Sequence, residues 1–369
     1  MAIFSEIENR DHEQIVFCSD KEAGLRAIIS IHDTTLGPSL GGCRMWNYNN
    51  EEEALRDVLR LSRGMTYKAS IAGLNLGGGK AVIIGNSKTD KNELLFRTFG
   101  RFIEGLGGRY ITAEDVGTSV RDMEWVRMET KYVTGIAQAH GGSGDPSPVT
   151  GLGVFTGMKA CAKRVYGSDS LAGKKISVQG LGHVGQNLVE RLVRDGATVY
   201  VTDIDEEKVS EVVKEYDVEV VDTDDIYGLD VDIFSPCALG GVINDDTIPQ
   251  LKCDIVAGAA NNQLEDESKH GHVLKENGIL YAPDYAINAG GLINVYNELE
   301  GYNLKRALRQ AEGIYDILND IFDRAEAEDI PTHFASNRVA EDRINNIGRI
   351  NNIYIGHPTG INIETSNRR

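Results

Sequence analysis

The chain has 369 residues, which is long for one ordinary hydrophobic core, so we expect two domains. Its 56 acidic and 38 basic residues give a net charge of −18, which argues against a nucleic-acid partner because phosphates would be repelled. No apolar run approaches the ~20 residues of a membrane helix, and the acidic N-terminus lacks a signal-peptide pattern, so we expect a cytoplasmic protein.

The cysteine and histidine residues show no pattern of a disulfide or metal framework. The five cysteines are scattered without a CxxC pair, which is typical of reduced thiols in a cytoplasmic protein. The eight histidines lack the spacing of metal ligands. We therefore expect no metal ion.

The first part of the chain alternates predicted strands and helices. Strands are predicted over residues 14–18, 26–32, 80–85 and 110–113, and helices over residues 50–65 and 90–106. Asp90 and Glu93 form a capping-box-like start for the second helix. The segment 32–46 contains Gly-Pro and Gly-Gly pairs, which predict a loop.

The stretch MTYKASIAGLNLGGGK, residues 65–80, carries two lysines in an unusual setting. Lys80 directly follows three glycines, a run that is favoured where the backbone must turn sharply or approach something closely. A single lysine is by default a solvated surface charge. The glycines beside Lys80 and the apolar sequence around Lys68 instead favour two lysines that face one small substrate, with the glycines bringing backbone close to it.

The second part of the chain predicts a parallel sheet. The segment SGDPSP, residues 143–148, is a composition break, and a helix is predicted over 149–165. Further strands are predicted over residues 174–180, 197–203, 218–222, 231–236, 254–260 and 278–283, with helical stretches between them. This alternation predicts a parallel sheet with right-handed crossovers, followed by helices to about residue 327 and then a terminal helix and tail.

A dinucleotide-binding signature follows the strand KKISVQ. Gly180, Gly182 and Gly185 form a G-x-G-x-x-G loop that opens a helix, where pyrophosphate can approach the backbone. The next strand ends in Asp203, eighteen residues after Gly185, which is suited to hydrogen-bond the adenosine ribose and to repel a 2′-phosphate. A glycine-rich turn that binds nothing is the alternative, but strand, glycines, helix and acid together favour NAD.

Three features indicate amine chemistry. Two nearby ammonium groups lower each other's pKa, so one of Lys68 and Lys80 can hold a carboxylate while the other serves as an acid or base. Asp115 lies at a predicted strand end, with a helix cap as the alternative role. Asn262 and Asn288 could orient the substrate or the nicotinamide, or could simply be turn residues.

Motifs along almost the whole chain resemble one family. They are, in chain order, IHDTTLGPSLGG with RMW, RGMTYK, GLNLGGGK, GRYITAEDVGT, VTGI, GSGDPSPVT, GLGHVG, SPCALGG, INDDTI, AGAANNQL and APDYAINAGG. In this order they are similar to the amino-acid dehydrogenases that act on glutamate, leucine, phenylalanine and valine, and most similar to the leucine type.

The resemblance implies the fold, the assembly and the roles of particular residues. It implies an α/β substrate-binding and oligomerisation domain over residues 1–147, joined by 333–369, and a Rossmann NAD-binding domain over 148–332, with a catalytic cleft between them and octameric assembly. By this resemblance Lys68 would bind the substrate α-carboxylate, Lys80 would activate water and Asp115 would exchange protons with the amino group. The implied substrate-binding residues are Lys68, Leu40, Gly41, Gly42, Met65, Ala113, Asn262, Leu292 and Val295. The implied cofactor-binding residues are Thr150, Gly180, Leu181, Gly182, His183, Val184, Gly185, Asp203, Ala238, Asn262 and Asn288.

The side-chain pocket distinguishes among the family's substrates. Glutamate-specific relatives hold the distal carboxylate with a lysine and a serine, where this chain has Leu40 and Val295. A buried carboxylate would lack a partner there, so glutamate is excluded. We expect reversible, NAD-dependent oxidative deamination of a branched-chain L-amino acid to a 2-oxo acid and ammonia. Valine or phenylalanine as the preferred substrate, a 2-hydroxy-acid dehydrogenase and a non-catalytic nucleotide sensor are the alternatives.

Overall fold

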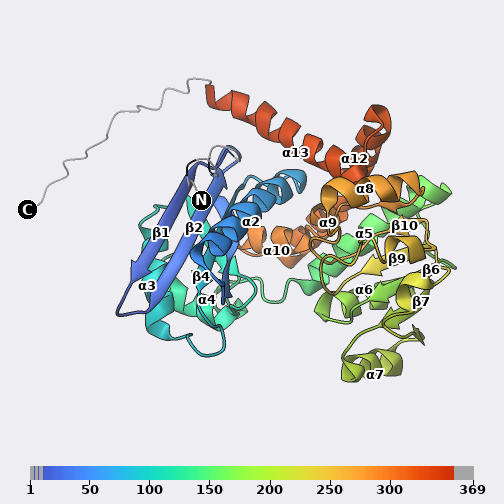
Figure 1. The fold of residues 1–369 in the computed structure, drawn as a ribbon, viewed down its shortest axis with the longest axis horizontal. Helices are drawn as coiled ribbons and strands as arrows, with labels where there is room; N and C mark the ends of the chain where they lie inside the picture. Colours follow the sequence, from blue (N-terminus) through green and yellow to red (C-terminus); the bar gives the residue numbers. More distant parts are fainter. Residues whose placement is uncertain (1–3, 5–6, 8–10, 353–369) are drawn as a thin grey trace, which may run out of the picture.

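Two β-sheets in separate lobes organise the computed structural model, which describes residues 4, 7 and 11–352 (Figure 1). The first sheet is built from the N-terminal third of the chain and the second from residues 175–281. Helices cover both sheets. Within the described residues, no helix is long and apolar enough to cross a membrane.

The first sheet is mixed, with strand order β1-β2-β4-β3-β5. Its strands are β1 (Gln14–Asp20), β2 (Leu25–Asp33), β3 (Ser39–Trp46), β4 (Gly77–Ile84) and β5 (Tyr110–Glu114). Strands β4, β3 and β5 are parallel, whereas β1 and β2 run antiparallel to their neighbours. Apolar side chains of α2 (Glu51–Ile71) pack on one face, and those of α3 (Glu93–Glu104) and α4 (Val120–Arg127) pack on the other.

Strand β3 corrects the predicted loop over 32–46, because residues 39–46 form a central strand. It pairs in parallel with β4 on one side and with β5 on the other. A Cβ on Gly41 would lie 1.7 Å from the carbonyl oxygen of Gly79, so the backbones approach too closely for any side chain. Glycine in a strand interior marks such close approaches as well as loops, and the loop interpretation was the wrong one here.

Helix α2 is longer than predicted and lies directly on β4. It continues to Ile71 rather than ending near residue 65, so Lys68 is in its last turn. A Cβ on Gly78 would lie 2.1 Å from the backbone nitrogen of Thr66. Gly77 and Gly79 are likewise enclosed by protein, so this glycine run accommodates neighbouring elements rather than the predicted substrate.

Helix α3 begins at Glu93 and differs from the prediction at its N-terminus. The side chain of Asn92 caps it by accepting a hydrogen bond from the backbone N–H of Leu95. Asp90 instead accepts from the backbone N–H of Asn86 in the preceding turn. The predicted capping role of Asp90 is therefore wrong, because the helix starts three residues later.

The second sheet is fully parallel, as predicted, with strand order β11-β10-β9-β6-β7-β8. Its strands are β6 (Lys175–Gln179), β7 (Thr198–Thr202), β8 (Glu219–Val220), β9 (Ile233–Pro236), β10 (Ile255–Val256) and β11 (Leu280–Tyr281). The helices that precede or connect them are α5 (Ser147–Tyr166), α6 (His183–Arg194), α7 (Glu206–Glu215) and α8 (Glu267–Glu276). Short 3-10 turns cover Gln138–His140, Ile226–Gly228, Ile248–Gln250 and Arg349–Asn352.

The C-terminal helices return the chain to the first lobe. They are α9 (Asp284–Ile287), α10 (Gly290–Leu299), α11 (Leu304–Glu312), α12 (Ile314–Glu328) and α13 (Thr332–Gly348). The Tyr67 hydroxyl on α2 donates to Glu341 on α13 at 2.6 Å, and Ser70 donates to the carbonyl of Ala340 at 2.8 Å. Residues 353–369 of the predicted terminal segment lie outside the described residues.

Candidate active site

Lys80 and Asp115, the two predicted catalytic residues, meet in an ion pair. Lys80 is in β4, and Asp115 directly follows β5. The Lys80 Nζ lies 3.0 Å from the Asp115 Oδ2, and the two side chains are 8% and 22% exposed. A nearly buried ammonium group therefore faces a carboxylate that solvent or a small substrate can still reach.

Gly42 makes room for the Asp115 side chain. In the β3–β5 ladder Cys43 pairs with Glu114, which places Asp115 just beyond the end of β5. A Cβ on Gly42 would lie 2.8 Å from the Asp115 Cβ. The Asp115 backbone N–H donates to Thr118 Oγ1 at 2.9 Å, which fixes the turn.

The alternative role of Asp115 as a helix cap is not the one observed. Helix α4 is capped by Ser119, which forms a capping box with Asp122. The Asp115 carboxylate instead binds Lys80 and Arg44. It is therefore a group of the site and not a helix terminus.

Charges and burial tune the groups of the site in different directions. Burial alone would raise the pKa of Asp115, but the charges of Lys80 and Arg44 outweigh it and hold this pKa below its usual value. Burial lowers the pKa of Lys68 to about 8; Asp284 opposes this shift, whereas Lys80 adds to it. The predicted effect of one lysine on the other is thus confirmed in direction, although burial is the larger cause.

Lys68 is connected to the second lobe through Asn288. Its Nζ donates to Asn288 Oδ1 at 2.7 Å. The Asn288 Nδ2 in turn donates to Ala259 O at 3.0 Å and to Asn261 Oδ1 at 2.8 Å. Asn288, predicted on the cofactor side, therefore also orients the lysine predicted to bind the substrate carboxylate.

Arg44 is a residue of the site to which the sequence analysis gave no role. Its Nε donates to Asp115 Oδ2 at 3.2 Å, and its Nη1 donates to Asp57 Oδ2 at 2.9 Å. The available signal was its position two residues after Gly42 in the GGCRMW segment. This spacing places Gly42 and Arg44 on the same face of the sheet, but only if the segment is known to be a strand.

Four of the five apolar residues predicted for the side-chain pocket belong to, or pack against, one large core cluster that extends through the second lobe. Leu40 from β3 and Leu292 from α10 are buried in it, and Met65 and Val295 pack against it. Ala113 is buried in β5 and pairs with Gly42. The strand and helix that carry these residues come from different lobes, so the pocket depends on how the lobes pack.

The glycine-rich loop after β6 has the features expected of a pyrophosphate cradle. A Cβ on Gly180 would lie 2.7 Å from the Ala238 Cβ, and one on Gly185 would lie 2.0 Å from the Gly180 carbonyl oxygen. A Cβ on Gly182 would meet nothing within 4 Å, so space remains at the position where phosphate would approach. Asp203 Oδ2 accepts from the backbone N–H of Leu181 at 2.6 Å, which places the acid beside the loop.

The other residues predicted for the cofactor side have differing surroundings and exposure. His183 begins α6 and is 81% exposed, with its Nδ1 3.7 Å from Asp145 Oδ2. Thr150 is buried in α5 and donates to the Pro146 carbonyl at 3.0 Å. Asn262 has a left-handed backbone with φ of 52°, which asparagine tolerates better than most residues. Val184 follows His183 in the first turn of α6.

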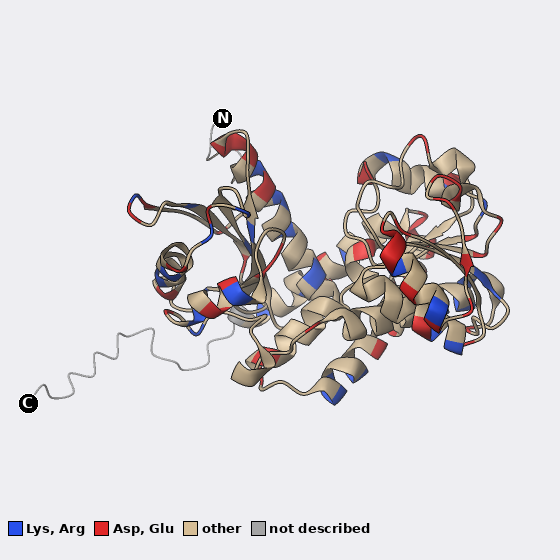
Figure 2. Cartoon of the chain, turned by 90° about the horizontal axis from the view of Figure 1, so that it is seen from below, with Lys and Arg blue, Asp and Glu red and all other residues tan. Residues whose placement is uncertain are grey.

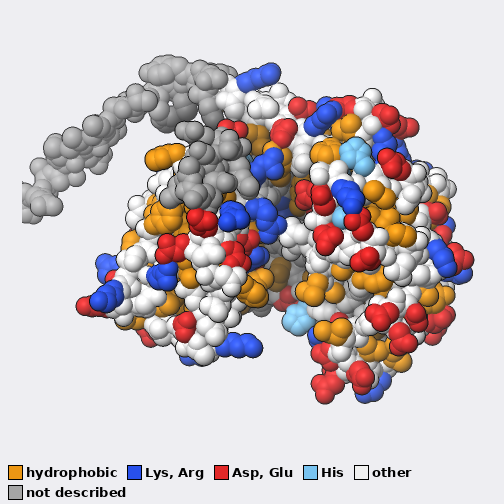
Figure 3. All heavy atoms as spheres, viewed as in Figure 1, with side chains coloured by type: hydrophobic (Ala, Val, Ile, Leu, Met, Phe, Trp, Pro, Cys, Tyr) orange, Lys and Arg blue, Asp and Glu red, His pale blue; other side chains and the backbone are white. Residues whose placement is uncertain are grey.

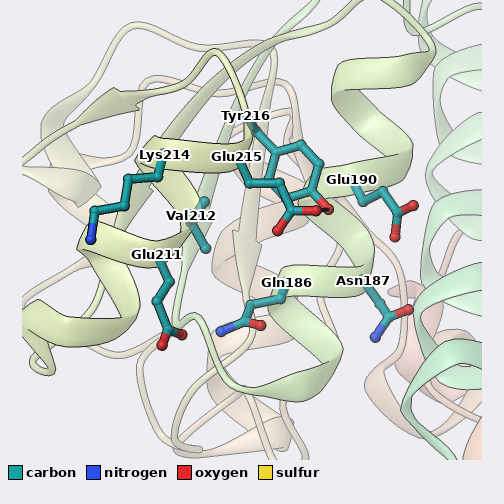
Figure 4. Close-up of a pocket in the computed structure, with 8 residues that line it drawn as sticks. All are labelled: Gln186, Asn187, Glu190, Glu211, Val212, Lys214, Glu215 and Tyr216. Carbon is teal, nitrogen blue, oxygen red and sulfur yellow. Dashed lines mark hydrogen bonds between the residues drawn. The ribbon is translucent and has the colours of Figure 1, made fainter.

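The surface carries a groove between the lobes and a separate hollow. Figure 3 shows the groove in the middle of the view, with Lys and Arg side chains along its left side. The hollow, of about 530 Å³, lies between α6 and α7, and three of the eight residues that line it are acidic, namely Glu190, Glu211 and Glu215 (Figure 4). None of the residues predicted for catalysis or binding lines it, so this hollow is separate from the candidate active site.

Two sequence models of one protein family match the chain. The Glu/Leu/Phe/Val dehydrogenase dimerisation domain matches residues 12–132, and the Glutamate/Leucine/Phenylalanine/Valine dehydrogenase domain matches 141–206 and 200–343. The chain belongs to this dehydrogenase family. It is thus an amino-acid dehydrogenase with a small-molecule substrate and a nicotinamide cofactor, as the sequence analysis expected.

Individual relatives in the family are similar over nearly the whole chain. A leucine dehydrogenase of Geobacillus stearothermophilus is 59% identical over 93% of this chain and 94% of its own length. The crystal structure of an L-tryptophan dehydrogenase from Nostoc punctiforme has a TM-score of 0.85 at 49% identity, over 94% of this chain and 99% of that one. A hetero-hexameric glutamate dehydrogenase of Thermus thermophilus, with a TM-score of 0.74 at 24% identity over 93% of this chain and 91% of that one, shares the fold.

Proposed function

We propose that this dehydrogenase catalyses the NAD-dependent, reversible oxidative deamination of branched-chain L-amino acids, foremost L-leucine, to 2-oxo acids and ammonia. The observation that carries the proposal is the Lys80–Asp115 pair at 3.0 Å beside an apolar cluster that contains Leu40 and Leu292. A branched aliphatic side chain suits such a cluster, whereas a second carboxylate would be costly there. Leucine dehydrogenases at 59% and 58% identity support the same substrate class.

Each basic and acidic group has a distinct task in this reaction. Lys68 binds the α-carboxylate, and Asn288 orients its ammonium group. Asp115, which its neighbours keep ionised, takes the proton of the substrate ammonium group. A nicotinamide held by the loop over residues 180–185 would supply the acceptor for the hydride of Cα. Lys80 then assists the attack of water on the imine and stabilises the carbinolamine from which ammonia leaves.

The cofactor proposal is NAD rather than NADP. The open position at Gly182 and the start of α6 suit a pyrophosphate, and Asp203 lies beside them. A carboxylate there can hydrogen-bond ribose hydroxyls but repels a 2′-phosphate. Thr150, Ala238, Asn262 and the loop over residues 180–185 complete the proposed cofactor site.

The proposed organisation follows the two lobes. A substrate-binding and oligomerisation domain would cover residues 1–147 together with 333–369, and an NAD-binding domain would cover 148–332. The contacts of α13 with α2 at Tyr67 and Ser70 support the return of the C-terminal segment to the first domain. We further propose a cytoplasmic homo-octamer, by analogy with leucine-type relatives.

A spectrophotometric panel tests the proposal. NADH formation at 340 nm is followed with L-leucine, L-valine, L-isoleucine, L-phenylalanine and L-tryptophan, each with NAD and with NADP. The highest kcat/KM is expected for L-leucine with NAD. A higher kcat/KM for an aromatic amino acid than for L-leucine would contradict the proposed substrate class. If no amino acid reacts, the non-catalytic nucleotide sensor remains as the alternative. A folded Lys80→Ala variant that keeps near wild-type turnover contradicts the mechanism.

A further inference from the structure

Arg44 joins the site to a carboxylate on α2. Its Nε binds Asp115 Oδ2 at 3.2 Å and its Nη1 binds Asp57 Oδ2 at 2.9 Å, so one guanidinium bridges two carboxylates. The Arg44 side chain is 21% exposed, and Asp57 and Asp115 are 16% and 22% exposed. Ion pairs at such partly buried positions are screened less by solvent than surface pairs.

The bridge is held at its far end as well. The Tyr48 hydroxyl donates to Asp57 Oδ2 at 2.7 Å, and Arg60 binds the other oxygen, Oδ1, at 3.1 Å. Asp57 therefore has a fixed carboxylate plane, onto which Arg44 docks. A planar guanidinium held by two partners has little freedom to rotate, which makes it a rigid support for Asp115.

The register of the sheet explains why this arginine reaches Asp115. Arg44 pairs with Val82 in the β3–β4 ladder, so Arg44 and Lys80 project from the same face of the sheet. Val82 packs against Val58 and Leu59 of α2, which identifies this face as the one that α2 covers. Lys80 and Arg44 thus approach the same oxygen of Asp115 from neighbouring strands.

We propose that Arg44 is a positioning residue of this dehydrogenase: from its anchor on Asp57 it holds the Asp115 carboxylate charged and oriented to receive the substrate's ammonium proton. The inference rests on the proposed function of Asp115. Lys80 cannot fill this role alone, because its own task at the carbinolamine requires it to exchange protons. Arg44 is suited to it, because a guanidinium stays protonated at every pH at which the enzyme works.

Other titratable groups near Asp115 do not replace this fixed charge. Besides Lys80 and Arg44, the groups that interact electrostatically with Asp115 include Lys68 on α2, Cys43 on β3, Tyr48 and Tyr110. Burial raises the pKa of the thiol and of both phenols, so these three groups stay neutral. Lys68 has a pKa of about 8 and loses its charge in the alkaline range.

The test is the pH dependence of kcat/KM for L-leucine in four variants. In Arg44→Gln the acidic limb is expected to move about one pH unit upward, because an adjacent arginine lowers a carboxylate pKa by about 1–3 units. The value of kcat should fall more than KM rises. In Arg44→Lys the acidic limb should move upward by less than in Arg44→Gln. Lysine keeps the positive charge but lacks the planar guanidinium that can bind two carboxylates.

Two matched variants separate this role from general damage to the network. Asp57→Asn weakens the anchor but keeps the Arg44 charge beside Asp115, so kcat should fall because Asp115 is less well oriented, whereas the acidic limb should not move upward. Arg97→Gln removes another arginine that bridges two carboxylates, Glu93 and Glu129, in the same lobe but outside the site, and should leave the profile unchanged.

The outcomes are distinct. An unchanged acidic limb in a folded Arg44→Gln enzyme overturns the inference, as does an equal upward shift in Asp57→Asn. If Arg44→Gln does not fold by circular dichroism, Arg44→Lys and Asp57→Asn decide, with a smaller upward shift expected in the first and none in the second. A wild-type enzyme without any amino-acid-dependent reduction of NAD contradicts the proposed function itself.

Discussion

The position of the Asp115 side chain depends on contacts with a few neighbouring residues. Gly42 lies beneath this side chain, and Arg44 and Lys80 approach one of its oxygens. The glycine has a steric role at this position, since its φ is not left-handed and the space above it is filled. Residues without any chemistry of their own can therefore control the geometry of the reacting groups.

Gly42→Ala is expected to reduce kcat at least about tenfold. The new Cβ would lie 2.4 Å from the Glu114 carbonyl oxygen and 2.8 Å from the Asp115 Cβ, so the turn that carries Asp115 must shift. A displacement of about 1 Å can cost on the order of a hundredfold in rate. Steady-state kinetics with L-leucine measures this, and Gly228→Ala, whose Cβ would meet nothing within 4 Å and whose φ is not left-handed, controls for substitution at a glycine. Equal kcat values in wild type and Gly42→Ala would contradict the steric role.

The affinity for a carboxylate should fall as pH rises through about 8. Lys68 has a pKa of about 8 and must be protonated to bind a carboxylate, so its binding is complete below that pH and lost above it. The Ki of 4-methylpentanoate against L-leucine measures this, because that inhibitor has no amine that titrates in the same range. In Lys68→Arg the rise of Ki between pH 7 and 9 should disappear. A pH-independent Ki in the wild type would contradict the assignment.

A buried histidine lies between helices α8 and α13. His333 is 4% exposed at the start of α13, and neither ring nitrogen has a hydrogen-bond partner among the described residues. Its ring fills the space above Gly271 on α8, where a Cβ would come within 2.2 Å of it, and lies in a tilted contact with the Phe334 ring at 3.9 Å between centroids. Burial, with a smaller contribution from His272, lowers the pKa of His333 to about 4.

This histidine should make the fold sensitive to acid. Its folded pKa of about 4 lies below the ordinary value of 6.5, so the neutral form stabilises the fold above pH 6.5 and that stability is lost as pH falls towards 4. The loss is up to about 3 kcal/mol of unfolding free energy. Urea unfolding of wild type and His333→Leu at pH 7 and pH 5 measures it, and the variant should lose less stability on acidification. The same pH dependence in both proteins would contradict the role of His333.

At the scale of the whole molecule, a few polar contacts join the lobes across long sequence separations. Lys68 on α2 binds Asn288, and Glu298 on α10 binds the backbone of Gly135 and Ser143. Acidic and basic side chains are interspersed over both lobes (Figure 2), and the excess of acidic residues gives the net charge of −18. The groove between the lobes therefore depends on specific contacts more than on the overall charge.

Glu298 is one such contact and should control the segment that joins the lobes. Its carboxylate on α10 accepts from the backbone N–H of Gly135 at 3.0 Å, from that of Ser143 at 2.8 Å, and from the Ser143 hydroxyl. In Glu298→Ala these donors lose their partner, which costs on the order of 1–3 kcal/mol for a buried group. Faster amide hydrogen exchange over residues 135–143 and a higher KM for L-leucine are expected, because α10 also carries Leu292 and Val295. Glu300→Ala on the same helix end is the control; equal exchange rates in both variants would count against the role of Glu298.

The enzyme family and the second sheet could be predicted from the sequence. Contiguous motifs and their flanking strands or helices contain the glycine loop, Asp203, Lys80 and Asp115. Such a motif predicts the same local structure whatever its tertiary surroundings. The alternation of short apolar strands with helices predicted the parallel sheet for the same reason. The assignment to the amino-acid dehydrogenases rested on these contiguous motifs and is confirmed by the family match.

Only the tertiary structure decided which glycines belong to strands and which charged residues meet. From sequence alone a glycine predicts a loop, because the neighbour that leaves no space for a side chain is not known. For this reason the glycines of β3 predicted a loop, and no role could be predicted for Arg44. Ion pairs such as Arg44 with Asp115, 71 residues apart, depend on strand order and register, and no local pattern encodes these. The residue types and their motifs therefore determined the family of this protein, whereas the packing of α2 on a glycine-lined sheet determined which of the predicted site residues lie together.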